Sequence, residues 1–417
     1  MTSVLDDLTA VTAPLVALYK DLHEHPELSF HENRTAGIVA ARLAELGFEV
    51  IEGVGTTGVV GLLRNGNGPT VLLRADMDAL PVLEQTGLEY ASTARGLDPA
   101  GIEQPVMHAC GHDVHVTCLL GAAEVLSTAR DAWSGTLEVV FQPAEELGAG
   151  AQAMVDDGLF ERVPVPDVVL GQHVAPMYAG VLGLHAGPAF AATDAFDVRM
   201  FGRGGHGSRP ETTIDPIVMA AATILRLQTV VSREVAGGET AVLTVGQIHA
   251  GSKNNIIPDE ATFGVAIRSL DAGVRDRVVA AVHRIIHAES AASGAEREPQ
   301  IIAVDTFPVL VNDIDASARV FGAFQHAFGA QRVIDPGPVT GSEDVSLLAT
   351  AVGAPLVFWL LGGTDARVYG AAAAAGTVER DIPANHSPFF APVPQPTLDA
   401  GVSALTVAAL QWLGGQK

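Results

Sequence analysis

The sequence predicts an α/β protein of two domains, in which a small α+β domain interrupts a larger α/β domain. Stretches with helical spacing alternate with short apolar runs over most of the chain, as in proteins whose helices pack on a mostly parallel sheet. Between about residues 188 and 305 the pattern changes, and the first pattern then resumes. The length of 417 residues also exceeds that of one ordinary domain.

The first part of the chain has the elements expected of an α/β domain. Helical spacing runs from Val4 to His25, before Pro26, and again from Glu32 to Leu46. A further helix is predicted to begin at Asp113, a good N-cap residue, and to run through residue 129. Short apolar runs predict buried strands over residues 59–63, 70–74, 137–141 and 168–170.

The middle part repeats the order strand, helix, strand. Strands are predicted over residues 196–200, 241–248, 261–267 and 300–304, with helices over 215–230 and 272–290. This order is typical of a ferredoxin-like, two-layer domain, here over residues 188–304. The larger domain then comprises residues 1–187 and 305–417, ending with a strand over 355–361 and a helix over 396–413. The alanine run at 371–375 lies next to glycines and is interpreted as a loop.

Composition excludes several classes of protein. Hydrophobic residues make up 48% and charged residues 17%, which is typical of a globular chain. A net charge of -24 argues against nucleic acid and anionic membranes as partners. No apolar run approaches the roughly 20 residues that span a bilayer, and the N-terminus lacks the pattern of a signal peptide. Because two cysteines cannot form a disulfide framework, we expect a cytoplasmic protein.

The densest chemical signal is the segment from Met107 to His115, which contains three histidines, a cysteine and an aspartate. Thiolate and imidazole suit soft and borderline metals, and Cys110 and His112 have a spacing that can chelate from one turn. Cys110 also precedes a predicted helix N-terminus, which should lower its pKa. The alternative is a chance cluster at a polar helix end.

Further candidate ligands follow predicted strands. His173 ends one apolar run, and His386 lies in an Asn-His-Ser-Pro segment. Glu145 and Glu146 follow the strand at 137–141; adjacent carboxylates there point in different directions, so one can bind a metal while the other holds a water. In isolation, the histidines would be structural and the glutamates an exposed turn. However, loops at strand ends are where α/β sheets place ligands.

Asp78 follows the strand at 70–74, in the segment Arg-Ala-Asp-Met-Asp78. Its carboxylate could hold a metal-bound histidine in the right orientation. An aspartate-capped turn is the alternative of similar weight.

Taken in order, these segments resemble the M20 metallopeptidase family, above all its amidohydrolase branch of hippurate hydrolases, N-acyl-amino-acid aminoacylases and auxin-conjugate hydrolases. The resemblance covers nearly the whole chain. It rests on nine segments: His23-Glu-His-Pro-Glu-Leu-Ser29, Arg-Ala-Asp-Met-Asp-Ala-Leu-Pro81, His-Ala-Cys-Gly-His-Asp113, Gln-Pro-Ala-Glu-Glu146, Gly-Gln-His173, Gly-Gly-His-Gly207, Asn-Ile-Ile-Pro-Asp259, Gly-Ser-Glu-Asp344 and Asn-His-Ser-Pro388. One such segment is weak evidence, whereas nine in order are specific.

The resemblance implies a phosphorylase/hydrolase-like catalytic domain with two divalent ions, which could be zinc, manganese, cobalt or nickel. It implies that Glu145 is the general base and that Asp78 supports the metal site. The cysteine replaces a bridging carboxylate found elsewhere in the family. The implied metal ligands are Cys110, His112, Glu146, His173 and His386.

The resemblance also implies roles for the inserted domain, which forms a lid and the contact of a homodimer. His206 is similar to a residue that stabilises the oxyanion, often across the dimer. Asn255 and Arg268 match substrate-contacting positions, the latter for a carboxylate. Glu211 and the pair Val265-Ala266 depart from the common pattern, so substrate preference does not carry over.

The sequence therefore predicts metal-dependent hydrolysis of an N-acyl amino acid or a similar small amide. One alternative is a dipeptidase or carboxypeptidase of the same superfamily. A second is a thiol hydrolase with Cys110 as nucleophile, although it leaves Glu146 and the two distant histidines without a role. A third is a binding protein that retained the fold without the activity.

Overall fold

The computed structural model describes residues 4, 8–98 and 101–414, and the chain forms two compact units. The first comprises Met1–Gly187, Val311–Gly337 and Asp344–Lys417, and the second comprises Pro188–Leu310 and Pro338–Glu343. The short return of residues 338–343 to the second unit was not expected from the sequence. Each unit has its own hydrophobic core.

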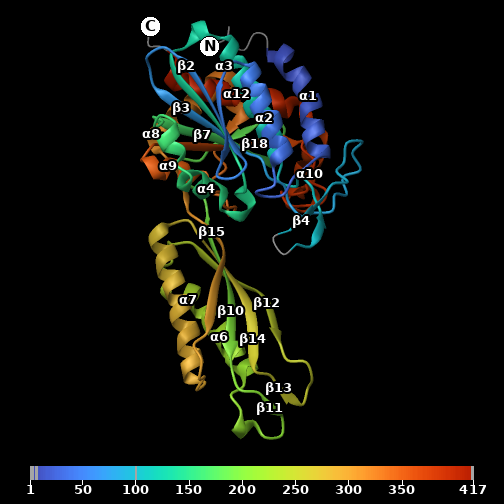
Figure 1. Ribbon diagram of the computed structural model, residues 1–417, viewed down its shortest axis with the longest axis vertical. Coiled ribbons are helices and arrows are strands. Elements are labelled where there is room, and N and C mark those ends of the chain that lie inside the picture. The colour runs from blue at the N-terminus through green and yellow to red at the C-terminus, as the bar shows by residue number, and fades with distance from the viewer. Residues whose placement is uncertain (1–3, 5–7, 99–100, 415–417) are drawn as a thin grey trace. The chain divides into compact units, whose positions relative to one another are not determined.

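A mixed sheet of eight strands forms the centre of the first unit (Figure 1), in the order β1-β2-β6-β3-β7-β18-β8-β17. The neighbours β6, β3, β7 and β18 run parallel, whereas β1 and β2 are antiparallel additions at one edge. The strands are β1 (Glu49–Val54), β2 (Gly58–Asn65), β3 (Thr70–Asp76), β6 (Gly135–Gln142), β7 (Val168–Tyr178), β8 (Leu182–Gly183), β17 (Val333–Ile334) and β18 (Leu356–Thr364). Two short pairs lie outside this sheet, β4 (Arg95–Leu97) with β5 (Glu103–Pro105) and β9 (Gly187–Phe190) with β16 (Leu310–Asn312).

Helices pack on the sheet and bury its apolar side chains. The helices α1, α3 and α12 contact one another, and α12 also contacts the central strands β3, β6, β7 and β18. Most residues of α12 are buried, and those from Ala400 to Leu410 are all buried, as expected of a helix in the middle of a core. The helices of this unit are α1 (Leu8–Glu24), α2 (Asn33–Glu45), α3 (His112–Thr128), α4 (Gly150–Asp156), α5 (Leu159–Arg162), α8 (Ile314–Phe328), α9 (Ser346–Val352), α10 (Ala366–Ala375), α11 (Val378–Asp381) and α12 (Pro394–Leu413).

The structure corrects three details of the predicted elements. The first helix begins at Leu8; Val4 lies outside it, and residues 5–7 lie outside the described residues. Helix α3 begins at His112 with Gly111 as N-cap, and Asp113 lies inside it, where its side chain binds His23. The alanine run at 371–375 is not a loop but the end of α10, because alanine is the best helix former and Gly376 terminates the helix in a left-handed conformation.

The second unit has the ferredoxin-like order predicted for it, with two strand-helix-strand units. Its antiparallel sheet has the order β12-β14-β10-β15, and α6 and α7 cover one face, so that residues of β14 alternate between buried and half-exposed. Asp215 caps α6 by accepting hydrogen bonds from two backbone amides. The elements are β10 (Ala192–Phe201), β11 (Gly205–His206), α6 (Pro216–Glu234), β12 (Ala241–Ala250), β13 (Ile256–Ile257), β14 (Glu260–Ser269), α7 (Ala272–Ala292) and β15 (Gln300–Phe307).

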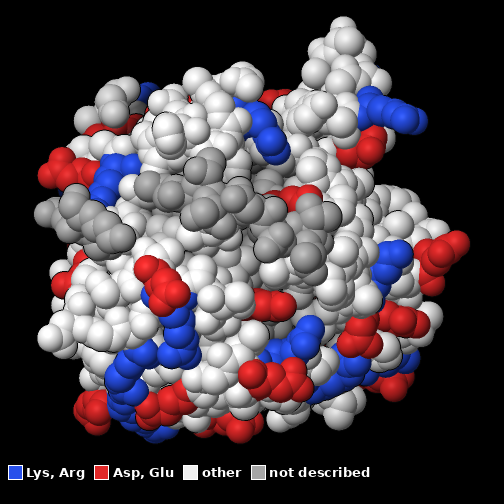
Figure 2. Space-filling view, turned by 90° about the horizontal axis from the view of Figure 1, so that it is seen from above, with Lys and Arg blue, Asp and Glu red and all other residues white. Residues whose placement is uncertain are grey.

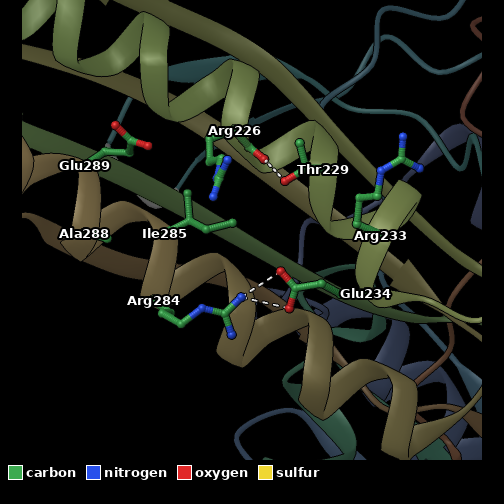
Figure 3. A pocket seen from close by; sticks show the side chains of 8 residues that line it. All are labelled: Arg226, Thr229, Arg233, Glu234, Arg284, Ile285, Ala288 and Glu289. Carbon is green, nitrogen blue, oxygen red and sulfur yellow. Dashed lines mark hydrogen bonds and ion pairs between the residues drawn. The ribbon is translucent and has the colours of Figure 1, made fainter.

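A hollow of about 500 Å³ lies between α6 and α7 (Figure 3). Arg284 donates to both carboxylate oxygens of Glu234 across it, at 2.7 and 2.8 Å. The lining residues are Arg226, Thr229, Arg233, Glu234, Arg284, Ile285, Ala288 and Glu289, none of which is a predicted site residue.

Charges are mixed on the face seen in Figure 2, where lysine and arginine side chains lie interspersed with acidic ones. Among the described residues, every helix falls short of the length and apolar character that crossing a bilayer requires.

Glu138 in β6 carries a buried carboxyl group. Its side chain is inaccessible to solvent, and neither of its oxygens has a hydrogen-bond partner within the described part of the chain. Burial raises its pKa to about 8, against a smaller lowering by Arg64. The folded protein therefore holds a proton that the unfolded chain releases above its ordinary pKa of 4.5.

We expect stability to depend on pH through this proton. Its contribution is fully present below the unfolded pKa and is lost as pH rises through the folded pKa of about 8. Glu138→Gln stays neutral, so by about pH 9 it should be more stable than the wild type by a few kcal/mol, with a smaller gain near pH 5. Urea unfolding across this range measures the difference, and Glu52→Gln, at an exposed position of β1, is the control. Parallel stability curves for Glu138→Gln and the wild type would contradict the expectation.

Candidate metal centre

Three parallel strands of the large sheet, β3, β6 and β7, end close to the predicted site residues. β3 ends shortly before Asp78, and β6 ends shortly before Glu145 and Glu146. In β7, Gly171 pairs with Arg74 of β3, so His173 lies level with the end of β3. α/β sheets bind their ligands at the carboxyl ends of parallel strands, and the predicted site residues lie at these ends.

Cys110, His112 and His173 form a first group, whose candidate ligand atoms all lie within 4.8 Å of one another. The Cys110 sulfur lies 3.4 Å from His173 Nε2. His173 Nδ1 lies 2.8 Å from the carbonyl oxygen of Val174, and His112 Nδ1 lies 3.2 Å from an Asp78 oxygen. Because Nδ1 donates in both rings, each neutral ring has its lone pair on Nε2, as a metal ligand requires.

Cys110, Glu146 and His386 form a second group within the same distance limit. His386 Nε2 lies 3.3 Å from one Glu146 oxygen, and the backbone amide of His386 donates to the carbonyl of Ala109 at 2.8 Å. Cys110 belongs to both groups. The arrangement therefore suits two ions that share one thiolate.

Two buried atoms test whether these residues fit metal ions. Within the described residues, His112 Nε2 and Glu146 Oε1 are buried and have no hydrogen-bond partner. They lie 3.8 Å apart, His112 in the first group and Glu146 in the second. A metal ion bound by each group would supply the partner that its buried atom lacks, and a polar atom buried without a partner is otherwise costly.

The electrostatics of the site also favour a cation. Burial, followed by the nearby Glu146 and Glu145, raises the pKa of Cys110 well above its usual value. The sequence-based expectation of a lowered pKa was therefore wrong for the protein without metal, because carboxylates surround the thiol. For His112, burial lowers the pKa, but Asp76 and Asp78 outweigh it and raise the pKa to about 10. Burial lowers the pKa of His173.

Asp78 connects the parts of this site, although it belongs to neither of the two groups of candidate ligands. One carboxylate oxygen faces His112 Nδ1 and accepts the backbone N–H of Glu145 at 3.1 Å. The other accepts the N–H of Glu146 at 3.0 Å and the hydroxyl of Ser29 at 2.6 Å. The carboxylate therefore fixes both the histidine ring and the turn with the two glutamates.

Three backbone positions in the site adopt the left-handed conformation. Gly111 has φ 83°, and a Cβ there would lie 2.3 Å from a methyl group of Val174, so glycine is required. Ala144 and His386 have φ 48° and 71°, which costs free energy for residues with a Cβ. Ala144 precedes Glu145, and His386 is itself a proposed ligand, so the strained backbone lies at positions that orient proposed functional groups.

Two further side chains, His115 and Asn385, connect segments of the site. His115 lies one helical turn beyond His112, binds Asp76 through Nδ1 and accepts the N–H of Val174 on Nε2 at 2.7 Å. The i, i+3 spacing of the two histidines on a helix could have indicated a shared face. Asn385 donates to the carbonyls of Cys110 and Val174 at 3.2 and 3.1 Å and so joins three segments. It belongs to the Asn-His-Ser-Pro segment of the resemblance, but no role was predicted for it.

The predicted residues of the second unit fall into two places. β11 pairs with β13, which sets His206 opposite Ile256, and the N–H of Gly207 donates to the carbonyl of Asn255 at 2.9 Å. His206 and Asn255 therefore lie together. Arg268 lies near the other end of β14, roughly 26 Å along the strand from its start by the usual rise per residue. Its guanidinium donates to the carbonyl of Thr340.

The fold and the shared-thiolate site define a class of protein, a metal-dependent hydrolase with an α/β catalytic domain and an inserted ferredoxin-like domain. Residues 72–395 match the sequence model of the family described as Peptidase family M20/M25/M40. The chain belongs to this family, and it is an amide-bond hydrolase of the amidohydrolase branch.

Relatives of known description agree with this assignment. The chain is 38% identical to thermostable carboxypeptidase 1 of Saccharolobus solfataricus, over 86% of this chain and 88% of the relative. It is 40% identical to hippurate hydrolase of Campylobacter jejuni, over 78% and 82%. A solved dinuclear metal-binding peptidase of the M20 family from Bacillus subtilis superposes with a TM-score of 0.74 at 28% identity, covering 96% and 99% of the two chains.

We expect metal binding to release protons. At pH 7 the metal-free protein holds a proton on Cys110 and a second on His112, because the pKa values of both lie above neutrality. Binding Zn²⁺ should therefore release about two protons, and affinity should rise with pH. Calorimetry in buffers of different ionisation enthalpy counts these protons, and Cys110→Ser should remove about one. A count near zero for the wild type would contradict the expected protonation of the site.

Proposed function

We propose that the protein hydrolyses the amide bond of N-acyl amino acids, or of similar small amide conjugates, with two divalent ions. The observation that carries the proposal is the pair of ligand groups that share Cys110, with Glu145 beside them. The hydrolases among its relatives support amide substrates. Bound ions would polarise the amide carbonyl and make water acidic enough to react at neutral pH.

The proposed ligand sets follow the two groups. Cys110 would be the ligand common to both ions, His112 and His173 would complete one site, and Glu146 and His386 would complete the other. Thiolate, imidazole and carboxylate together suit zinc, manganese, cobalt or nickel.

Glu145 acts as general base in this proposal. Its side chain is buried, and Glu145 Oε2 lies 3.9 Å from His112 Nε2, beside the proposed metal position. Its carboxylate takes one proton from the attacking water as the new C–O bond forms. It then gives that proton to the leaving nitrogen as the C–N bond breaks, releasing the carboxylate and the free amine.

His206 is suited to stabilise the oxyanion. The backbone N–H of Ser208 donates to His206 Nδ1 at 3.1 Å, so the neutral ring carries its proton on Nε2 and can donate it. One such donor contributes roughly 3–4 kcal/mol to an acyl-transfer transition state. We propose that Asn255 contacts the substrate beside it. We propose that Arg268, whose Nη1 donates to Thr340 and Ser342, binds a carboxylate of the substrate.

A carboxypeptidase or dipeptidase is the second candidate, favoured by the 38% identity to a thermostable carboxypeptidase. It differs in accepting substrates with a free α-amino group. A thiol hydrolase is less consistent with the site, because the raised pKa of Cys110 keeps the thiol protonated in the absence of a cation.

The test is a panel of N-acyl amino acids and unblocked dipeptides, offered to chelated protein with and without zinc, manganese, cobalt or nickel. We expect metal-dependent release of the amino acid from acylated substrates. Glu145→Gln should still bind two ions but lose at least about 100-fold in kcat, since general bases contribute 10²–10⁴-fold. Cleavage of dipeptides alone would establish the second candidate. Turnover indifferent to metal, or an active Glu145→Gln variant, would overturn the mechanism.

We also propose a homodimer through the second unit. α6 exposes Val218 and Leu225, with 64% and 73% of their surface accessible, on one stripe with Ile217. The adjacent β12 is an edge strand and exposes Ile248. Apolar side chains beside an unpaired strand edge are features of self-association. We place the protein in the cytoplasm, because Cys110 must stay reduced to bind metal.

A double substitution tests the dimer. Val218→Glu with Leu225→Glu puts charges on the stripe, so we expect a monomer of about half the mass by light scattering after gel filtration. Ile302→Glu, on the opposite edge strand β15, is the matched control and should stay dimeric. A wild type that is monomeric at micromolar concentration, or a double variant that remains dimeric, would contradict the proposed interface.

A further inference from the structure

We propose that Glu32 is a positioning residue that holds the turn carrying Glu145 and Glu146 in its working conformation. This inference rests on the proposed function of those two glutamates. Glu32 lies 113 positions before Glu145 in the sequence, at the start of α2, and it belongs to none of the candidate metal groups.

The Glu32 carboxylate connects three segments of the first unit. One oxygen accepts the backbone N–H of Phe30 at 3.0 Å and that of Ala144 at 2.9 Å. The other accepts the hydroxyl of Thr57, in the turn between β1 and β2. The side chain is fully buried. A buried carboxylate is costly unless polar groups surround it, so these contacts account for its place.

Ala144, which donates its N–H to Glu32, has an unusual backbone conformation. It adopts φ 48°, a left-handed conformation that is strained for a residue with a Cβ. The chain turns there between the end of β6 and the short helix of Glu145–Leu147. The hydrogen bond from its N–H to Glu32 opposes relaxation to an ordinary conformation.

The turn transmits this constraint to the site. With Ala144 left-handed, the N–H groups of Glu145 and Glu146 both point at Asp78, at 3.1 and 3.0 Å. A relaxed Ala144 would rotate these amides and the two side chains that follow. Glu32 and Asp78 therefore hold consecutive amides of one turn from two different elements, and loss of either should misplace the base and one ligand.

The charge environment supports this arrangement. Burial, and then repulsion by Asp78, raises the pKa of Glu32 to about 7, against the hydrogen bonds from Thr57 and Ala144. Burial alone would disfavour the ionised carboxylate, and the hydrogen bonds from Thr57 and Ala144 offset part of that cost. Although Glu32 is the N-cap residue of α2, its side chain makes no capping hydrogen bond to that helix.

The experiment is a rescue. Glu32→Ala should lower kcat by at least about tenfold at saturating Co²⁺, with KM changed far less, because the base is misplaced and binding is not. Adding Ala144→Gly to that variant should restore most of the loss, since glycine adopts positive φ without strain. Ala144→Gly alone is the reference. Glu27→Ala is the matched control, because Glu27 accepts two N–H groups of α2 at 2.9 and 2.8 Å without contact to the turn.

The visible spectrum of bound Co²⁺ gives a second readout that does not need turnover. Glu32→Ala should change the band intensities, which report ligand geometry, and Ala144→Gly should return them toward the wild type. A folded Glu32→Ala variant with wild-type kcat and spectrum would overturn the proposal. So would a loss that Ala144→Gly fails to reduce, or that Glu27→Ala reproduces. If the wild type cleaves no substrate of the panel, the proposed function fails, whereas the spectra still decide the role of Glu32.

Discussion

The carboxylate of Asp78 is the interaction on which the rest of the site depends. It receives the ring of His112 from α3 and two backbone amides from the turn after β6, and Ser29 supports it from the N-terminal segment. Each of these groups comes from a different element, and Asp78 itself follows β3. A single carboxylate at a strand end therefore converts the register of the sheet into the geometry of a reaction site.

Around this point the protein accumulates negative charge that it cannot neutralise alone. Arg74 is buried and contacts Asp76 at 2.6 Å and Asp344 at 3.2 Å. Burial nevertheless raises the pKa of Asp344 to about 6, although Arg74 and Gln142 oppose it. The acidic side chains gathered here are Glu32, Asp76, Asp78, Glu145, Glu146 and Asp344. Although burial opposes it, His112 lowers the pKa values of Asp76 and Asp78, so these two carboxylates stay ionised. The pKa values of Glu32, Asp344 and Cys110 are raised, and divalent cations would compensate for this charge directly.

The alternation of strands and helices, the inserted domain and the segments that meet at the carboxyl ends of the strands could be predicted from the sequence, because they depend on apolar periodicity and on motif order. Properties that depend on neighbours distant in the sequence could not. Burial, and then Glu146 and Glu145, which are distant in sequence, raise the pKa of Cys110, whereas the position before a helix N-terminus had predicted a lowered one. Asp113 was predicted to be the N-cap of α3, but Gly111 is the N-cap, and Asp113 lies in the first turn and contacts His23. Whether His206 and Arg268 reach the substrate stays a prediction.

His386 differs from the other proposed ligands in a way that bears on how the protein acquires its ions. Its side chain is 56% exposed, whereas that of His112 is inaccessible. An ion held partly by an exposed ring can leave through the solvent, while one behind buried ligands must wait for the fold to open. The two positions would then exchange at unequal rates. The metal content of a purified sample would record growth conditions at one position and the last buffer at the other.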